Sequence, residues 1–280
     1  MRRWTATALT LLLLLPALRV CAQTRLSGGI FGDETELYAE TKQVGQFFRR
    51  FNGEEGKDGE RFYDGDELYR DETYRREYLN LLFDNEAGDI HEGTKRRFIN
   101  DVCSSSPHLL DFHGGQWFAE VRSQFFYRGK QEEITLFMVL EADGLGYKWV
   151  IDRVRFDVYD EMFPRGEAIG DAIPFLHPLS HELDFMNLAK VFRDTRDIEP
   201  YTSGEFEPDH LTLFLLDIWR GNLEYVTVSG TRFHFFQVDG WYFSLRDIQR
   251  QGYNTGWLIT RLEALDDGDQ EALLHLIYND

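Results

Sequence analysis

A helix-then-strand pattern recurs along this chain, and the repeat constrains the fold more than any other feature of the sequence. Three residues of the first copy have counterparts at a constant offset of 108 (257 minus 149): Trp149 and Trp257, Ile151 and Ile259, and Arg153 and Arg261. Upstream, residues 98–102 resemble 214–218 at an offset of 116 (214 minus 98). A shorter hairpin in the second copy would explain the smaller offset. We therefore expect two copies of one unit.

Helix and strand signals follow the same order in both copies. The first copy predicts helices over 33–52, around 74–82 and from 94, followed by strands over 117–126, 136–140 and 147–154. The second predicts helices over 182–193 and from 208, strands over 224–228, 233–238, 241–246 and 257–262, and a short terminal helix over 272–277. The predicted fold class is α+β, with helices packed on a curved antiparallel sheet in each of two tandem units.

The strand over 136–140 differs from its neighbours because it is apolar on both faces. Residues 117–126 alternate between apolar and polar side chains, as expected for a half-buried antiparallel strand. Leu136, Met138 and Leu140 point one way, and Phe137 and Val139 point the other. We expect helices on one face of this strand and either the other repeat or another subunit on the second.

The first 22 residues are typical of a secretory signal peptide. Arg2 and Arg3 precede a short apolar run over 9–15, and Ala22 precedes Gln23 at a plausible cleavage site. The expected location is the periplasm or the cell exterior. A lipoprotein anchored through Cys21 is the alternative, which the preceding Arg19 and Val20 disfavour.

The remaining chain divides into two predicted domains. They cover 33–160 and 181–265, with a linker rich in Pro and Gly over 161–180 and a tail over 266–280. Cleavage would leave Cys103 as the only cysteine, which excludes an internal disulfide. We expect Cys103 to be a small buried side chain on its helix. The 23 Phe residues predict large cores filled with rings.

The strong negative charge of the chain limits its partners. The formal net charge is −19, which disfavours nucleic acid and anionic membrane surfaces. No later apolar run approaches the roughly 20 residues that a spanning helix needs. The expected partner is a protein or a small molecule, and the negative net charge favours a positively charged partner.

Two or three helices followed by an aromatic-rich antiparallel sheet, closed by the strands WVIDRV and WLITRL, resemble the NTF2-like (cystatin-like, SnoaL-like) superfamily. The resemblance covers both copies. The chain is also similar to exported Bacteroidetes proteins, whose Ala-Gln cleavage sites resemble Ala22-Gln23. The superfamily implies a cone-shaped sheet with helices over its concave side and a pocket between them. Its members include isomerases and cyclases, and many that only bind ligands or partners, so the fold does not decide the function.

The residues that recur in both copies are the candidate ligand-binding residues: Trp149, Arg153, Trp257 and Arg261. Alternation places each Trp on the same strand face as its Arg, which predicts an aromatic wall with a guanidinium for an anionic group. The alternative is a core Trp with an Arg that reaches water at the strand end.

A catalytic role has weaker support. An isomerase-like site needs a carboxylate or His in an apolar pocket, and the candidates are Asp111, His113, Glu120, Asp152 and His234. None recurs in both copies, and His234 shares a predicted face with Arg232, as on a surface. We assign no catalytic residue and no cofactor. We expect a non-enzymatic binding or interaction module, with a small-molecule enzyme or carrier that uses one pocket as the alternative.

Two motifs invite a metal interpretation that their spacing does not support. The acidic loop with Asp58, Asp64 and Asp66 lacks the alternating ligands of a calcium loop. His177 and His181 are four residues apart, as in helical zinc sites. Pro178 places His177 at or before a helix start, where the two rings need not share a face. We therefore expect no metal.

Overall fold

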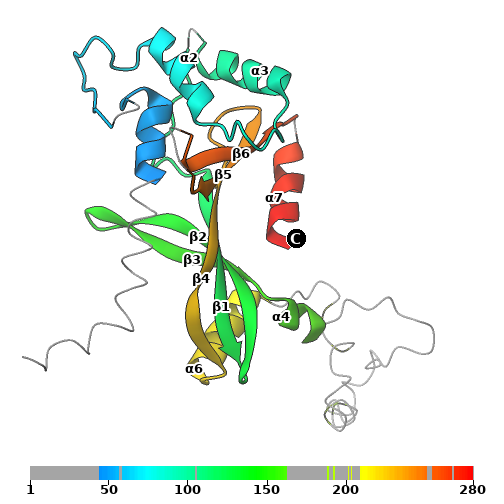
Figure 1. Cartoon of the computed structure of the whole chain (residues 1–280). Coiled ribbons are helices and arrows are strands. Elements are labelled where there is room, and N and C mark those ends of the chain that lie inside the picture. The colour runs from blue at the N-terminus through cyan, green and yellow to red at the C-terminus, as the bar shows by residue number, and fades with distance from the viewer. Residues whose placement is uncertain are drawn as a thin grey trace, which may run out of the picture.

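One antiparallel sheet of six strands organises the fold (Figure 1). The computed structural model describes residues 44–56, 59–104, 106–162, 209–250, 254–266 and 268–279, and the single residues 188, 192, 201 and 203. The predicted signal peptide, the linker from residue 163 and the helix over 182–193 lie outside the described residues, apart from two isolated positions in that helix.

The strand order is β3-β2-β1-β4-β5-β6. The strands are β1 (Trp117–Tyr127), β2 (Lys130–Asp143), β3 (Gly146–Arg155), β4 (Leu223–Phe235), β5 (Trp241–Ile248) and β6 (Gly256–Ala264). The helices are a first one that includes residues 44–52, α2 (Glu72–Leu81), α3 (Glu92–Val102), α4 (Asp157–Met162), α6 (His210–Trp219) and α7 (Asp269–Asn279).

Local sequence signals account for most of these elements. The first helix ends at Asn52, and Gly53 follows with a φ of 73°, the left-handed conformation expected at a helix end. Asp71 caps α2 by accepting a hydrogen bond from the Tyr74 backbone nitrogen at 2.8 Å. The two strands predicted over 224–228 and 233–238 form one strand, β4, which has irregular register near its middle. The coarse α+β class is confirmed.

The strands of the two predicted units lie in one sheet, and a division into two tandem units is not confirmed. Each half nevertheless contributes a helix followed by three antiparallel strands, and the halves meet where β1 pairs with β4. The helices are exchanged between the halves: α3 contacts β6, and α6 contacts β3 as well as β4. In Figure 1, α2 and α3 accordingly lie near β5 and β6, while α6 lies at the opposite end of the sheet.

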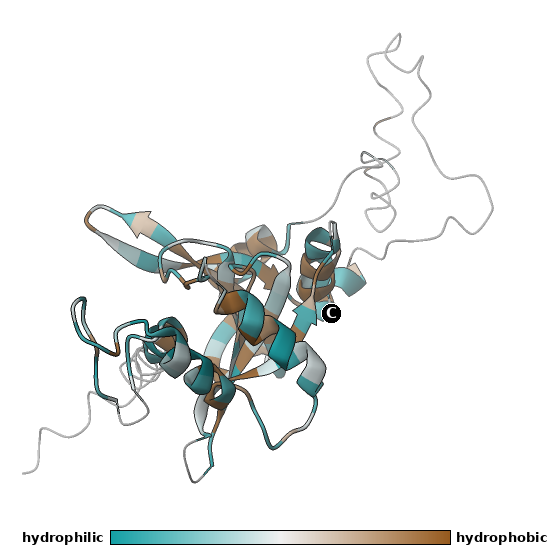
Figure 2. Cartoon of the chain, turned by 90° about the horizontal axis from the view of Figure 1, so that it is seen from above, coloured by the Kyte–Doolittle hydropathy of each residue, from teal (hydrophilic) through white to brown (hydrophobic). Residues whose placement is uncertain are grey.

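One face of the sheet packs against the first helix, α2, α3 and α6 and forms the main core. We call it the core face. Its centre is a set of rings: Phe235 stacks on Phe243 with centroids 4.8 Å apart, and Phe47 of the first helix lies 6.3 Å from Phe243. Figure 2 shows the helices with hydrophobic residues on one side and hydrophilic ones on the other. Cys103 is buried at the end of α3, as predicted.

A buried arginine joins the helices that cover this core. Arg75 of α2 donates to the backbone oxygens of Phe51 at 2.8 Å and Val102 at 3.1 Å, and also to His108. Phe51 and Val102 lie in the last turns of two helices, where carbonyl groups lack helical partners. Arg75 thus satisfies carbonyls that the helices leave open.

The second face of the sheet is covered in part by α7. Phe118 and Phe137 of this face pack with Tyr278, at centroid distances of 5.4 and 4.9 Å. The C-terminal helix therefore provides the cover that we expected from the other repeat or from another subunit. Among the described residues, no helix is both long and apolar enough to cross a bilayer.

Candidate functional site: an arginine-rich sheet face

Arginine side chains gather on the second face of the sheet, which we call the arginine face. They are Arg122 on β1, Arg153 and Arg155 on β3, Arg232 on β4, Arg246 on β5 and Arg261 on β6. Each alternates along its strand with residues of the core face. Six guanidinium groups on one face contrast with the net charge of −19 of the whole chain.

Beneath these arginines lies a buried chain of hydrogen bonds. His234 is 1% exposed. Its Nε2 lies 2.9 Å from Oε2 of Glu120, and its Nδ1 lies 2.9 Å from the hydroxyl of Tyr242. The guanidinium of Arg232 lies 3.3 Å from the same Glu120 oxygen. Glu120 on β1 therefore interacts with both His234 and Arg232 of the neighbouring strand β4.

The environment of this chain fixes its protonation. Burial lowers the pKa of His234, outweighing the opposing effect of Glu120, so the ring is neutral near pH 7. Burial alone would raise the pKa of Glu120, but the His234 hydrogen bond and the charge of Arg232 outweigh it, and the pKa is lowered. The neutral ring then donates from Nε2 to the Glu120 carboxylate, and its Nδ1 accepts from the Tyr242 hydroxyl.

This arrangement indicates a structural role for Glu120 and His234, which hold the arginine side chains in place, and not a role in proton transfer. A general base needs a pKa near the working pH and a site that reaches the substrate. Glu120 is instead held ionised by its neighbours, and both ring nitrogens of His234 are engaged. Glu120 positions Arg232 and is the buried carboxylate of the described part of this face.

Two further arginines, Arg122 and Arg246, lie on the same face as this group. Within the part of the chain that the structure describes, no ion pair joins Arg122 or Arg246 to a carboxylate. Burial, and then the charges of Arg232 and Arg122, lower the pKa of Arg246, as expected for guanidinium groups that repel one another. We call Arg122, Arg232 and Arg246 the arginine cluster.

A glycine makes room for the cluster. A Cβ atom added to Gly230 on β4 would lie 2.9 Å from the guanidinium of Arg122, which is closer than real Cβ atoms approach other atoms. Gly230 is the register partner of Arg122 on the neighbouring strand. The missing side chain lets the guanidinium of Arg122 lie across the β4 backbone.

The structure separates the residues of the predicted Trp–Arg pairs. Trp149 packs on Trp117 at the core face, with centroids 5.3 Å apart, whereas Arg153 lies over the Tyr278 ring on the arginine face. Trp257 packs on Phe233 at 4.8 Å, and Arg261 lies over Tyr242. The expectation that each Trp shares a strand face with its Arg was therefore wrong.

Irregular pairing is the physical reason. The register of β3 on β2 shifts between Ile151 and Arg153, and the register of β6 on β5 shifts between Ile259 and Arg261. Each shift is a bulge, in which one extra residue reverses the alternation of the side chains that follow. The bulge residues, Asp152 and Thr260, occupy equivalent positions of the sequence repeat. Ligand binding by the four residues remains a prediction.

The other catalytic candidates do not join the arginine cluster. Asp111 caps a turn by accepting from the His113 backbone nitrogen at 2.9 Å, and the His113 ring stacks on Tyr147 at 4.1 Å. Asp152 is exposed. Glu120 and His234 do come together, and the expectation that His234 lies on a surface was wrong because its ring is buried, stacked on Phe118 and bonded to Tyr242.

Local sequence patterns do not identify Arg122, Arg246 and Tyr242 as members of this site. Strand alternation alone places Arg122 beside Glu120, but the pairing of β1 with β4 over more than 100 residues was needed to bring Arg232 and Arg246 to it. Of the metal candidates, His177 and His181 lie outside the described residues. Asp66 accepts from the Tyr63 backbone nitrogen at 2.7 Å within its loop.

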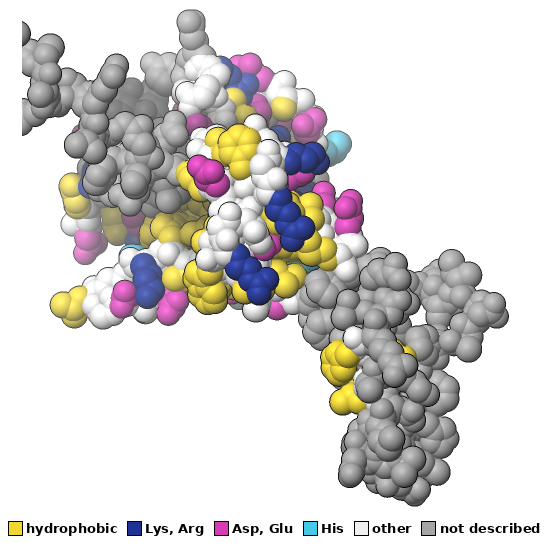
Figure 3. All heavy atoms as spheres, turned by 90° about the horizontal axis from the view of Figure 1, so that it is seen from below, with side chains coloured by type: hydrophobic (Ala, Val, Ile, Leu, Met, Phe, Trp, Pro, Cys, Tyr) yellow, Lys and Arg dark blue, Asp and Glu magenta, His cyan; other side chains and the backbone are white. Residues whose placement is uncertain are grey.

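Figure 3 shows Lys and Arg side chains beside hydrophobic ones over much of the described surface seen from below.

Comparisons with models of known families, with curated proteins and with solved structures give no match.

Proposed function

We propose that this protein is a non-enzymatic binding module that holds an anionic group on the arginine cluster. The observation that carries the proposal is the placement of three guanidinium groups near enough to repel one another, one of them bonded to the buried Glu120 carboxylate, on a sheet face of an otherwise acidic chain. The repulsion among the three groups is relieved when a negatively charged group lies between them.

The chemistry of arginine favours oxygen anions. A guanidinium presents a rigid fork of donors that matches carboxylate, sulfate and phosphate oxygens. Arg232 is fixed from below by Glu120, so part of the entropy of ordering the site is lost before binding. The sheet backbone holds Arg122 and Arg246 on strands at either side of β4. The ligand should therefore carry at least two negative oxygens.

The proposal includes an origin for the fold. We propose that the chain is an exported fusion of two NTF2-like units whose strands joined into one sheet. The matching helix-and-three-strand order, the matching bulges and the reciprocal placement of α3 and α6 support this. Under this proposal, residues 1–22 are a signal peptide, and the units correspond to the predicted domains over 33–160 and 181–265.

Titration calorimetry with pyrophosphate and with citrate tests the binding function and distinguishes phosphate from carboxylate ligands. We expect at least one of these anions to bind, with an affinity that falls as salt rises. Replacing Arg246 or Arg122 by Ala should weaken binding about tenfold, the effect of losing about 1.4 kcal/mol from a charge-assisted hydrogen bond.

Arg96→Ala is the matched control. Arg96 is exposed on α3, away from the arginine face, so its removal changes the net charge equally but should leave affinity unchanged. Equal weakening by all three substitutions would show a non-specific charge effect and would contradict the proposal, as would the absence of binding by either anion.

A further inference from the structure

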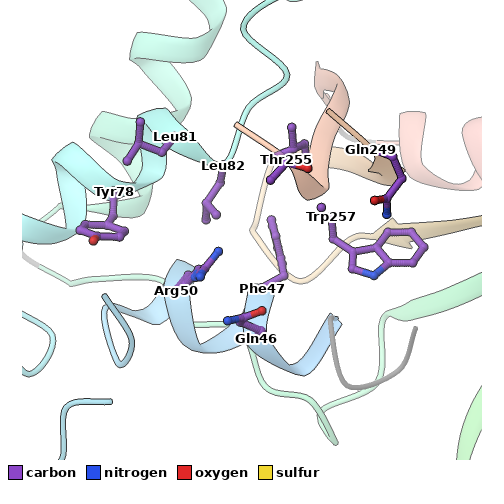
Figure 4. A pocket seen from close by; sticks show the side chains of 11 residues that line it. Gln46, Phe47, Arg50, Tyr78, Leu81, Leu82, Gln249, Thr255 and Trp257 are labelled. Atoms are coloured by element: carbon purple, nitrogen blue, oxygen red, sulfur yellow. The ribbon is translucent and has the colours of Figure 1, made fainter. Parts of the chain in front are cut away.

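A second site lies between the helices and the edge of the sheet, on the core side of β6. A cavity of about 340 Å³ opens between the first helix, α2 and the start of β6 (Figure 4). Its lining combines polar groups with rings and aliphatic side chains: Gln46, Arg50, Tyr78, Gln249, Thr255 and Trp257. Its volume is at the small end of the range of about 300–1,000 Å³ for ligand pockets.

Trp257 lines this cavity, and Asp247 is its neighbour on β5; each has a buried polar atom without a hydrogen-bond partner among the described residues. Among the described residues, neither the indole Nε1 of Trp257 nor the carboxylate Oδ1 of Asp247 forms a hydrogen bond. The two residues are register partners on β6 and β5, so their side chains lie side by side on one face. Trp257 is only 5% exposed. A buried polar group without a hydrogen bond is costly and rare in native proteins.

The missing partners define a chemical class. The indole nitrogen only donates, and the carboxylate oxygen only accepts. A hydroxyl group both accepts and donates, so one hydroxyl can satisfy the two atoms together. The side-chain amides of Gln46 and Gln249 also line the cavity. Each donates one hydrogen bond within the protein, to Glu55 and to Asp247, and keeps its amide oxygen and second N–H for a ligand. Tyr78 and Trp257 provide ring surfaces.

The charges of the cavity exclude an anion. Arg50 lies 3.5 Å from the buried carboxylate of Glu55, which offsets its charge, and the unpaired oxygen of Asp247 repels negative groups. We propose that this cavity binds a neutral, polyhydroxylated small molecule, such as one monosaccharide ring. Trp257 donates to a ligand hydroxyl and Asp247 accepts from it.

This site is independent of the anion site. Trp257 faces the core side of the sheet, whereas the arginine cluster lies on the opposite face. Loss of one site should therefore leave the other intact, and the two proposals can fail separately.

The test follows the indole N–H signal of Trp257 by nuclear magnetic resonance while glucose, galactose, mannose or N-acetylglucosamine is added to the full chain. Trp257→Phe assigns the signal. We expect at least one sugar to shift it. Titration calorimetry with that sugar should then show about tenfold weaker binding by Trp257→Phe, because an aromatic ring remains but the N–H donor and part of the ring surface are lost. Trp149→Phe, at the equivalent position of β3, should leave sugar binding unchanged.

Gln249→Ala provides a second variant outside the core, since Gln249 is exposed, lines the cavity and donates from its amide to Oδ2 of Asp247 at 2.5 Å. It should also weaken sugar binding. The proposal is overturned if none of the four sugars shifts the Trp257 signal, which would leave water as the partner of the two atoms. Equal effects of Trp257→Phe and Trp149→Phe would overturn it as well.

Discussion

The two faces of the sheet are built from the same strands but differ in chemistry: one is packed with aromatic rings, and the other carries charged side chains. On the core face, Phe235 and Phe243 stack at 4.8 Å with an angle of 4° between their planes, and helices exclude water from them. On the arginine face, ionised Glu120 is buried beside Arg232 and His234, and α7 covers only part of the surface. The first face stabilises the fold, and the second carries charge that the fold must hold in place.

The charged group on the arginine face is assembled by strand pairing and not by a local sequence motif. Glu120 and His234 are 114 residues apart, yet β1 and β4 bring their side chains to 2.9 Å. Burying the ionised Glu120 carboxylate is unfavourable, and its interactions with Arg232 and His234 on β4 offset that free energy. Substitutions on each face should therefore disturb the molecule in different ways.

The largest expected effect comes from Phe243→Ala on the core face. Phe243 is 0% exposed and contacts Phe47, Phe51, Phe98 and Phe235. Removing its ring should lower the free energy of unfolding by about 4 kcal/mol through lost burial and the cavity left behind.

Phe137→Ala is the comparison on the arginine face, where the lost ring contacts Phe118, Tyr278 and the guanidinium of Arg155. Among the described helices, α7 packs over it, so the site is covered by one helix rather than several and the loss should be smaller. Urea unfolding of both variants measures the difference. A larger loss for Phe137→Ala would contradict the assignment of the main core to the other face.

An intermediate effect is expected from pH, and it is specific to the arginine face. Because burial lowers the pKa of His234 below its ordinary value of 6.5, the unfolded chain takes up a proton there before the folded one does. The stabilisation is complete above pH 6.5 and is lost as the pH falls from 6.5 toward the lowered pKa. The loss approaches about 1.4 kcal/mol per pH unit for one proton.

Urea unfolding at pH 7.0 and 5.5 measures this loss, with His234→Gln as the comparison. The groups that face His234 are Glu120, Tyr242, Arg232 and Arg261. The lowered pKa of Glu120 places its own titration below 4.5, outside this window. The variant should therefore lose less stability than the unmodified protein over the same interval, by about 1 kcal/mol at most. An equal loss in both proteins would assign the pH dependence to other groups.

The sequence predicted the fold where local periodicity decides it. The helix containing Tyr74 and Tyr78, the strand from Trp117 and the helix that ends at Asn52 all follow from spacing and capping residues. Pairing between distant strands has no such local signal, so the single sheet was not foreseen. The bulges at Asp152 and Thr260 also have no local sequence signal. Simple alternation assigns Arg153 and Arg261 to the core face, whereas the bulges place them on the arginine face.

The smallest expected effect concerns α7, which the sequence predicted as a short terminal helix over 272–277 and which extends over Asp269–Asn279. Arg155 donates to the backbone oxygen of Ile277 at 3.0 Å, where the open carbonyls at the end of α7 attract a cation. Arg155→Ala should cost about 1 kcal/mol at most, since the bond is only partly buried. Hydrogen exchange should show faster opening of the last turn of α7 but unchanged exchange in α3. Unchanged exchange in α7 would mean that its apolar contacts with Phe118 and Phe137 alone hold it on the arginine face.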